Sequence, residues 1–271
     1  MQNNYIMLQT DRKIYYTLRF AAAMCFIGHG SFGIITKQIW CNYFAVFGID
    51  SLTAYKLMPF MGIIDILMGI SLLVYPTRII VWWLVVWGCI TAFLRPVSGE
   101  PFAEFIERAG NFGTPLALLI LCSAMEKNVS GWFRFLKPAE YIDAKTMAKV
   151  TTCLKVVVFL SLAGHGWLNL IEKKGIINQY ASLGFSNPLH IAHLAGTFEL
   201  LAACTVLVRP LRQLIFVFLI WKIGTELFYP HWELFEWLER GGSYGALLAL
   251  WLALPRTTLP AADVDLTAST P

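Results

Sequence analysis

The apolar residues of this chain are gathered into eight long runs that are separated by short polar segments. None of the runs alternates strictly between apolar and polar positions, as a strand of a membrane barrel would. A helix of about 20 apolar residues crosses a hydrocarbon layer of roughly 30 Å and satisfies its own backbone hydrogen bonds there. The pattern therefore predicts eight transmembrane helices, over residues 17–36, 57–75, 79–94, 111–125, 152–171, 190–208, 213–229 and 241–255.

The composition excludes a soluble globular domain. Of the 271 residues, 57% are hydrophobic and 14% are charged, and the mean hydropathy is +0.61. So little polar surface cannot cover a single water-facing domain of this size. The net charge of +4 is spread along the chain and predicts no nucleic-acid partner. We expect an all-α integral membrane protein whose main partner is the lipid bilayer.

The distribution of lysine and arginine predicts the orientation. More of these residues fall on the side of the termini and the even-numbered connections, and positive charge favours the cytoplasmic side. Both termini are therefore expected in the cytoplasm, with the chain in a bacterial-type cytoplasmic (inner) membrane. The expected parts are a cytoplasmic N-terminal segment (1–16), a first four-helix module (17–125), a cytoplasmic linker (126–151), a second four-helix module (152–255) and a cytoplasmic C-terminal tail (256–271).

The two modules are copies of one another. A shift of 136 residues aligns the Gly-His-Gly motif around His29 with that around His165, and a shift of 134 aligns Asp65 with Glu199. Because each copy has four helices, both copies start on the same side of the bilayer. We therefore expect a pseudo-twofold axis along the membrane normal, with an interior surface between the two repeats.

Ionisable residues within the spans are the strongest indication of a functional site. Each costs about 2.5–3.5 kcal/mol at a helix centre on the mildest scale, so such residues are usually internal and paired. Four of them recur as a histidine and an acid in each copy. We predict that they bind a ligand or handle protons; the alternative is that each pair only locks two helices together. The four are His29, Asp65, His165 and Glu199.

A second recurring set of charges is expected near the outer ends of the helices. One lysine follows each histidine by about two helical turns, and a segment with acids and an arginine precedes the last helix of each copy. These residues either surround the mouth of a cavity, or are interfacial lysines and short amphipathic helices on the outer membrane surface. The predicted cavity entrance comprises Lys37, Lys173, Glu107, Arg108, Glu239 and Arg240.

The sequence argues against most cofactors. A haem held by His29 and His165 is disfavoured because no second histidine pair recurs. The six cysteines form no close pair, so no zinc or other metal site and no disulfide relay is expected. A glycine-rich phosphate loop and a serine nucleophile motif are both absent from the sequence, and no catalytic residue is identified.

The order of these motifs resembles the DoxX-like membrane protein family. The resemblance covers about residues 17–255 as two fused four-helix modules, and Asp65 stands where that family usually has glutamate. It implies an integral membrane protein that is linked in some members to quinone reduction, so quinone is the cofactor it suggests. The first copy carries the resemblance in His29-Gly30, Lys37, Gly48, Gly62 and Asp65, and the second in His165-Gly166, Lys173, Gly184, Gly196 and Glu199.

Three functions are compatible with these features. The leading hypothesis is a quinone-linked redox membrane subunit that binds a quinone-like molecule between its two repeats and works with soluble or membrane redox subunits. The first alternative is a small-molecule or proton-coupled transporter, for which midplane acids and parallel repeats are also suited. The second is a non-catalytic membrane scaffold subunit of a larger complex. The residues do not decide whether the chain is an enzyme.

Overall fold

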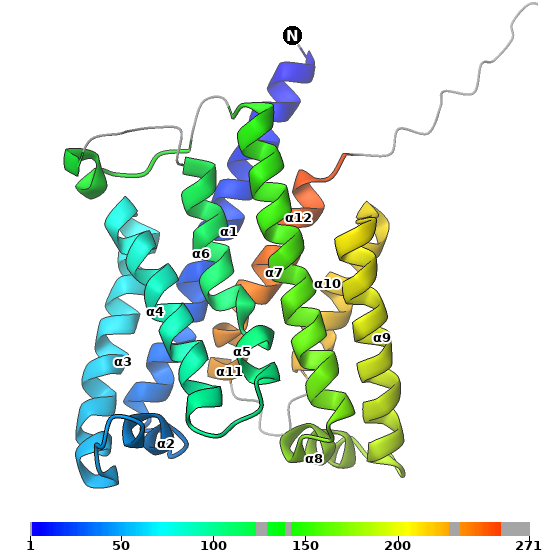
Figure 1. Ribbon diagram of the computed structural model, residues 1–271. Coiled ribbons are helices and arrows are strands. Elements are labelled where there is room, and N and C mark those ends of the chain that lie inside the picture. Colours follow the sequence, from blue (N-terminus) through cyan, green and yellow to red (C-terminus); the bar gives the residue numbers. More distant parts are fainter. Residues whose placement is uncertain (1, 123–128, 139–141, 228–233, 256–271) are drawn as a thin grey trace, which may run out of the picture.

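The computed structural model describes residues 2–122, 129–138, 142–227 and 234–255, which form an elongated bundle of helices (Figure 1). The helices of the first half are α1 (Gln2–Ile34), α2 (Trp40–Ala45), α3 (Ser51–Val74), α4 (Arg78–Val97), α5 (Ala103–Glu107) and α6 (Ala109–Cys122). The 3-10 helix η2 (Val129–Phe133) lies between the halves in the sequence, and the helices of the second half are α7 (Ala144–Leu170), α8 (Lys174–Ser182), α9 (Pro188–Val208), α10 (Arg212–Leu227), α11 (Leu234–Glu239) and α12 (Gly241–Ala253).

The described residues contain four helices that are long and apolar enough to cross a membrane, namely α3, α4, α7 and α9. A helix lies at each of the eight expected positions, but α6, α10 and α12 have 14, 16 and 13 residues, fewer than the roughly 17–25 that a span needs. Helix α1 has 33 residues, and charged side chains occupy its first half. The prediction of eight spans is therefore wrong in this form.

Two of the long helices extend beyond the predicted spans. Helix α1 extends through the expected N-terminal segment 1–16, and α7 begins at Ala144, inside the expected linker 126–151. Residues 123–128, 139–141, 228–229 and the tail 256–271 lie outside the described residues.

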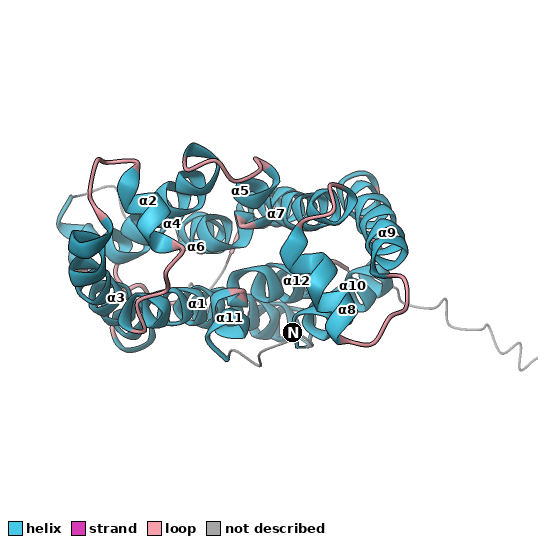
Figure 2. Cartoon of the chain, turned by 90° about the horizontal axis from the view of Figure 1, so that it is seen from below, coloured by secondary structure: helices cyan, strands magenta, loops and turns pink. Residues whose placement is uncertain are grey.

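The two halves use the same helix pairings. Helix α1 packs against α3 and α4 against α6, just as α7 packs against α9 and α10 against α12. Across the middle, α1 contacts α12 and α6 contacts α7. Figure 2 shows the two halves side by side, with α1, α6, α7 and α12 in the centre. We call the halves the first unit (residues 2–122) and the second unit (residues 142–255).

Equivalent backbone turns end the first long helix of each unit. Thr36 and Glu172 have φ of 53° and 56°, a left-handed conformation in which the chain leaves the helix. The next residues, Lys37 and Lys173, donate their backbone N–H groups five residues back, to Phe32 and Leu168, at 3.1 Å. This Schellman-type ending satisfies helix carbonyls. The chain then enters α2 or α8, which pack on helices of the same unit.

Glycines allow the units to meet backbone to backbone at the centre. A Cβ on Gly110 of α6 would lie 2.5 Å from the backbone nitrogen of Ser243 in α12, which is closer than real Cβ contacts come. Beside this contact, the Thr114 hydroxyl donates to the Gly242 carbonyl at 2.7 Å. Small residues thus replace side-chain packing with direct helix contact, as is usual between membrane helices.

The two short helices α5 and α11, expected as interfacial helices, turn acidic side chains into the protein. Each inserts into the other unit, with α5 against α7 and α11 against α1. Glu104 and Glu107 of α5 are 0% and 5% exposed. Gly164 and Gly28 have no side chain at the points where the backbones of Glu107 and Glu239 pass. Charged residues assigned to an interfacial lid therefore lie inside the protein.

Replacing Gly110 with valine should lower stability by about 1–3 kcal/mol, because the added side chain has no room at the Ser243 backbone. The measurement is chemical unfolding in detergent micelles. Gly224→Ala, inside α10 with open space around its Cα, is the matched control and should be neutral or stabilising by about 0.5–1 kcal/mol. Equal effects of both changes would contradict the close contact between the units.

Candidate functional site

His29, Asp65 and a tryptophan form a hydrogen-bonded triad in the first unit. His29 Nδ1 lies 2.7 Å from Asp65 Oδ2, and Trp87 Nε1 donates to Asp65 Oδ1 at 2.7 Å. Asp65 is 1% exposed, so both of its oxygens are satisfied within the protein. With Asp65 holding Nδ1, the orientation of the imidazole is set and Nε2 is left for other contacts.

The second unit contains an equivalent triad. His165 Nδ1 lies 2.6 Å from Glu199 Oε2, and Trp221 Nε1 donates to Glu199 Oε1 at 3.0 Å. Asn169 adds contacts that the first triad lacks: it donates to the His165 backbone carbonyl and accepts from the Tyr180 hydroxyl. The structure thus brings together the histidine and acid within each unit, as the sequence predicts.

Close helix approach explains how each triad is positioned. A Cβ on Gly30 would lie 2.5 Å from the Gly62 carbonyl oxygen, and one on Gly166 would lie 2.8 Å from the Gly196 carbonyl oxygen. The helix that carries the histidine therefore nearly touches the helix that carries the acid. The glycine one turn before each acid is a geometric requirement of the pair.

The sequence reasoning missed both tryptophans. Trp87 and Trp221 are separated by the same 134 residues that separate Asp65 from Glu199, so the repeat itself contained the signal. Indole N–H groups need a partner when buried, and here the carboxylates supply it.

The predicted entrance lysines join the two units. Lys37 Nζ lies 2.7 Å from Glu236 Oε1 of α11, and Lys173 forms the equivalent ion pair with Glu104 of α5. Each lysine follows the left-handed turn at the end of α1 or α7 and so reaches the short helix of the opposite unit. These lysines hold the units together and line no part of the main cavity described below.

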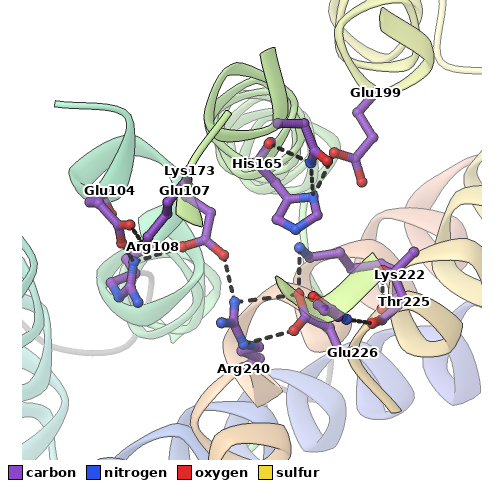
Figure 3. A network of polar contacts seen from close by, with 12 residues as sticks. Glu104, Glu107, Arg108, His165, Lys173, Glu199, Lys222, Thr225, Glu226 and Arg240 are labelled. Carbon is purple, nitrogen blue, oxygen red and sulfur yellow. Dashed lines mark hydrogen bonds and ion pairs between the residues drawn. The ribbon is translucent and has the colours of Figure 1, made fainter. Parts of the chain in front are cut away.

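Two partly buried arginines and the buried Glu107 form a network between the units (Figure 3). Glu107 Oε2 lies 2.7 Å from Arg108 NH1, and Glu107 Oε1 lies 2.6 Å from Arg240 NH1. Burial alone would raise the pKa of Glu107, but Arg240 and Arg108 together lower it below its usual 4.5. Glu107 is therefore a charged link between one arginine of each unit.

The network continues into the second unit through α10. Glu226 Oε2 lies 2.8 Å from Arg240 Nε, and Glu226 Oε1 lies 2.7 Å from Lys222 Nζ. Both side chains of the Lys222 and Glu226 pair are 2% exposed. The sequence analysis did not place Lys222 or Glu226 in the site, because neither has a charged counterpart in the first unit.

A cavity of about 270 Å³ lies in the first unit. Its walls are mostly aromatic and come from α2, the turn after α2, and α4. Its polar end is formed by polar residues of the first unit and by one glutamate from the second unit. The aromatic walls come from Trp40, Tyr43, Phe44, Phe47 and Trp87. The polar end comprises His29, Asp65, Arg95, Arg108, Asn111 and Glu239.

Two polar groups at this end face the cavity without a partner of their own. Within the described residues, His29 Nε2 makes no hydrogen bond and the Glu239 carboxylate has no ion pair or hydrogen bond. Burial would raise the pKa of Glu239, but Arg108 and His29 lower it. The cavity therefore offers a charged acceptor, an imidazole nitrogen and the guanidinium of Arg108 to a ligand.

The cavity differs from the shared chamber that was expected between the repeats. It lies within the first unit, with Glu239 as its contribution from the second, and His165 and Glu199 do not line it. Of the six predicted entrance residues, Arg108 and Glu239 line the cavity, and the others belong to the contacts between the units. Among the residues described, no group of three or more His, Cys, Asp or Glu side chains is placed to hold a metal ion.

Replacing Glu107 with leucine should cost about 3–5 kcal/mol, because Arg108 and Arg240 would each lose a buried partner. Lys37→Met breaks the half-exposed pair with Glu236 and should cost less than about 1 kcal/mol. Unfolding of both variants in detergent measures the difference. A Glu107→Leu protein as stable as Lys37→Met would show that the buried network contributes little.

Acid should destabilise the fold by protonating glutamates that are held ionised by neighbouring arginines. The pKa values of Glu107, Glu239 and Glu100 are lower in the folded protein than their usual 4.5. Their contribution is fully present above the unfolded value and is lost as the pH falls towards the folded values. The melting temperature in detergent should thus fall below about pH 4.5, and less steeply in Glu107→Gln. A melting temperature that is constant down to about pH 3 would contradict this.

Comparison with known proteins leaves the family open. No protein-family model, no curated protein and no solved structure matched the chain. The resemblance to the DoxX-like family stays a prediction from the sequence, and the function is argued from the site itself.

Proposed function

We propose that this chain is a multi-pass membrane protein whose first unit binds a small, mainly apolar molecule with a polar head group, such as a quinone. The observation that carries the proposal is the aromatic cavity that ends in the His29 and Asp65 pair. The four candidate spans and the apolar surfaces support a membrane location.

The outer faces of the candidate spans are suited to lipid. On α3, the side chains of Phe60, Leu67 and Val74 are 61%, 54% and 70% exposed, and Leu201 on α9 is 64% exposed. Large contiguous apolar surfaces of this kind are rare on soluble monomers. In lipid they require no further cover. The excess of lysine and arginine near the termini supports an inner-membrane protein with cytoplasmic termini.

The shape of the cavity favours a ring-sized ligand. Its volume of about 270 Å³ is slightly below the range of drug-sized pockets and is large enough for a single aromatic ring with substituents. Trp40, Trp87 and Tyr43 offer flat surfaces against which such a ring can stack. A tail would leave past Phe47, near the end of α2.

The polar end of the cavity is suited to a carbonyl or hydroxyl group. His29 is held through Nδ1 by Asp65, so Nε2 can donate to a carbonyl oxygen or accept from a hydroxyl. Arg108 can donate to a second oxygen. A quinone and its reduced form present these two groups in turn, and proton transfer at Nε2 would accompany the change.

The proposal agrees with the resemblance to the DoxX-like family. That resemblance implies a quinone-linked redox membrane subunit, in which partner redox subunits would supply or accept the electrons. This chain would then provide the ligand cavity and the proton-handling histidine.

A matched pair of variants tests the proposal. A short-tail benzoquinone should quench tryptophan fluorescence of the detergent-solubilised protein saturably, because Trp40 and Trp87 line the cavity. His29→Gln should weaken binding by about tenfold, which corresponds to the loss of about 1.4 kcal/mol. His165→Gln makes the same change in the second unit, outside the cavity, and should leave the affinity unchanged.

Two results would contradict the proposal. One is quenching that does not saturate, together with no quinone in protein purified with its native lipids. The other is an equal loss of affinity in His29→Gln and His165→Gln, which would indicate a structural role for both triads.

A further inference from the structure

In the second unit, an internal ion pair lies at the position that corresponds to the cavity of the first unit. The offset of 134 residues relates Asp65 to Glu199, and the two tryptophans that bond these acids keep the same offset. It therefore also relates Gly88 to Lys222 and Ala92 to Glu226. The first unit has a glycine and an alanine where the second unit has a long cation and a long anion.

The side chains around this ion pair are the repeat counterparts of side chains that line the polar end of the cavity in the first unit. Glu226 is bound by Arg240, the counterpart of Arg108. Figure 3 shows the ammonium group of Lys222 between the His165 ring and Glu226. Glu226 thus lies at the position where Ala92 lines the cavity of the first unit, and Lys222 lies beside it.

In the first unit, Gly88 packs directly against the backbone of α6 and does not line the cavity. A Cβ on Gly88 would lie 3.0 Å from the Asn111 carbonyl oxygen, so a side chain does not fit there without movement. Ala92 lines the cavity and reaches none of its polar groups. The difference between the units therefore lies at two equivalent positions, on α4 in the first unit and on α10 in the second.

We propose that the second unit holds a closed copy of the binding site, in which Lys222 and Glu226 take the place of a ligand. This inference rests on the proposed ligand cavity of the first unit. It means that one chain binds one ligand molecule, in the first unit, although both units have the histidine, acid and tryptophan triad.

The internal pair also defines the polarity of the ligand. Lys222 and Glu226 together carry no net charge, and both units keep one histidine, one triad acid, one arginine and one glutamate around the site. The additional Arg95 of the first unit is paired with Glu100 at 3.2 Å. The ligand of the first unit is therefore neutral overall, and in its reduced, hydroxyl form it donates towards His29 and Glu239 and accepts from Arg108.

Probes of equal size and different charge test the polarity. 1-Naphthol is neutral and has a hydroxyl that both donates and accepts, whereas 1-naphthoate is an anion and 1-naphthylmethylammonium is a cation. We expect 1-naphthol to bind at least about tenfold more tightly than either ion, a difference of about 1.4 kcal/mol. Tighter binding of either ion would overturn the assigned polarity.

Opening the second unit tests the closed copy. Lys222→Gly combined with Glu226→Ala reproduces the first unit and should double the number of 1-naphthol molecules bound per chain. The control, Lys222→Met with Glu226→Leu, removes the charges but keeps the volume, and should bind no additional molecule. A folded opened variant with unchanged stoichiometry would overturn the closed copy.

A substitution that closes the first unit tests the inference even if the opened variant does not fold. Ala92→Glu places a carboxylate where Arg108 can bind it, as Arg240 binds Glu226, and should abolish 1-naphthol binding. If folded Ala92→Glu protein binds 1-naphthol with wild-type affinity, the two positions are not equivalent and the inference fails.

Cysteine labelling separates this inference from the proposed function. Thr91 lines the cavity, and Thr225 is its counterpart in the second unit. A small apolar thiol reagent, followed by peptide mass spectrometry, should modify Thr91→Cys in the otherwise wild-type chain. It should modify Thr225→Cys much faster when Lys222 and Glu226 are also replaced.

The labelling result does not depend on a ligand. If the wild-type chain binds no 1-naphthol and no quinone, the proposed function fails while the labelling still decides whether the second site is closed. If Thr225→Cys reacts equally with and without Lys222 and Glu226, the closed copy fails while the first cavity can still bind its ligand.

Discussion

The structure depends on the close approach of each unit's first long helix to a short helix of the other unit. Gly28 and Gly164 permit this approach, because any side chain there would collide with the backbone of Glu239 or Glu107. The exchange brings charged residues of both units to one place in the middle of the protein. The carboxylates and arginines found there are acceptable only because each can find partners across the boundary between the units.

The same exchange makes the cavity a property of the whole chain. The triad and the aromatic walls come from the first unit, but the acceptor at the polar end, Glu239, comes from α11 of the second. The ion pairs of Lys37 and Lys173 secure α11 and α5 where they enter the opposite unit. Geometry at the cavity is thus maintained by contacts that do not themselves touch a ligand.

Much of the fold could be predicted from the sequence, because apolar runs and the repeat are local or regularly spaced signals. Both histidine and acid pairs were identified in this way, since repetition of costly polar residues stands out. The number of spans was wrong because helix lengths depend on where the chain turns, and α12, for example, has 13 residues, fewer than a span needs.

The contacts between the units could not be predicted in the same way. The partners of Lys37 and Lys173 lie 199 and 69 residues away in the chain, and no local pattern links them. The sequence shows Lys222 as a charge inside an apolar run. Its role depends on its contact with Glu226, which also binds Arg240, and on the absence of a side chain at its counterpart, Gly88. Departures from the repeat were as informative as the repeat itself.

Covalent connection of the two units removes a restriction that a symmetric dimer would impose. In a homodimer of identical units, a lysine at the position of Lys222 would stand in both sites at once, and closing one would close the other. In a single chain the two copies can diverge independently. One copy can keep an open chamber while the other becomes a rigid support, with its interior ion pair anchoring the arginine that reaches across to its neighbour.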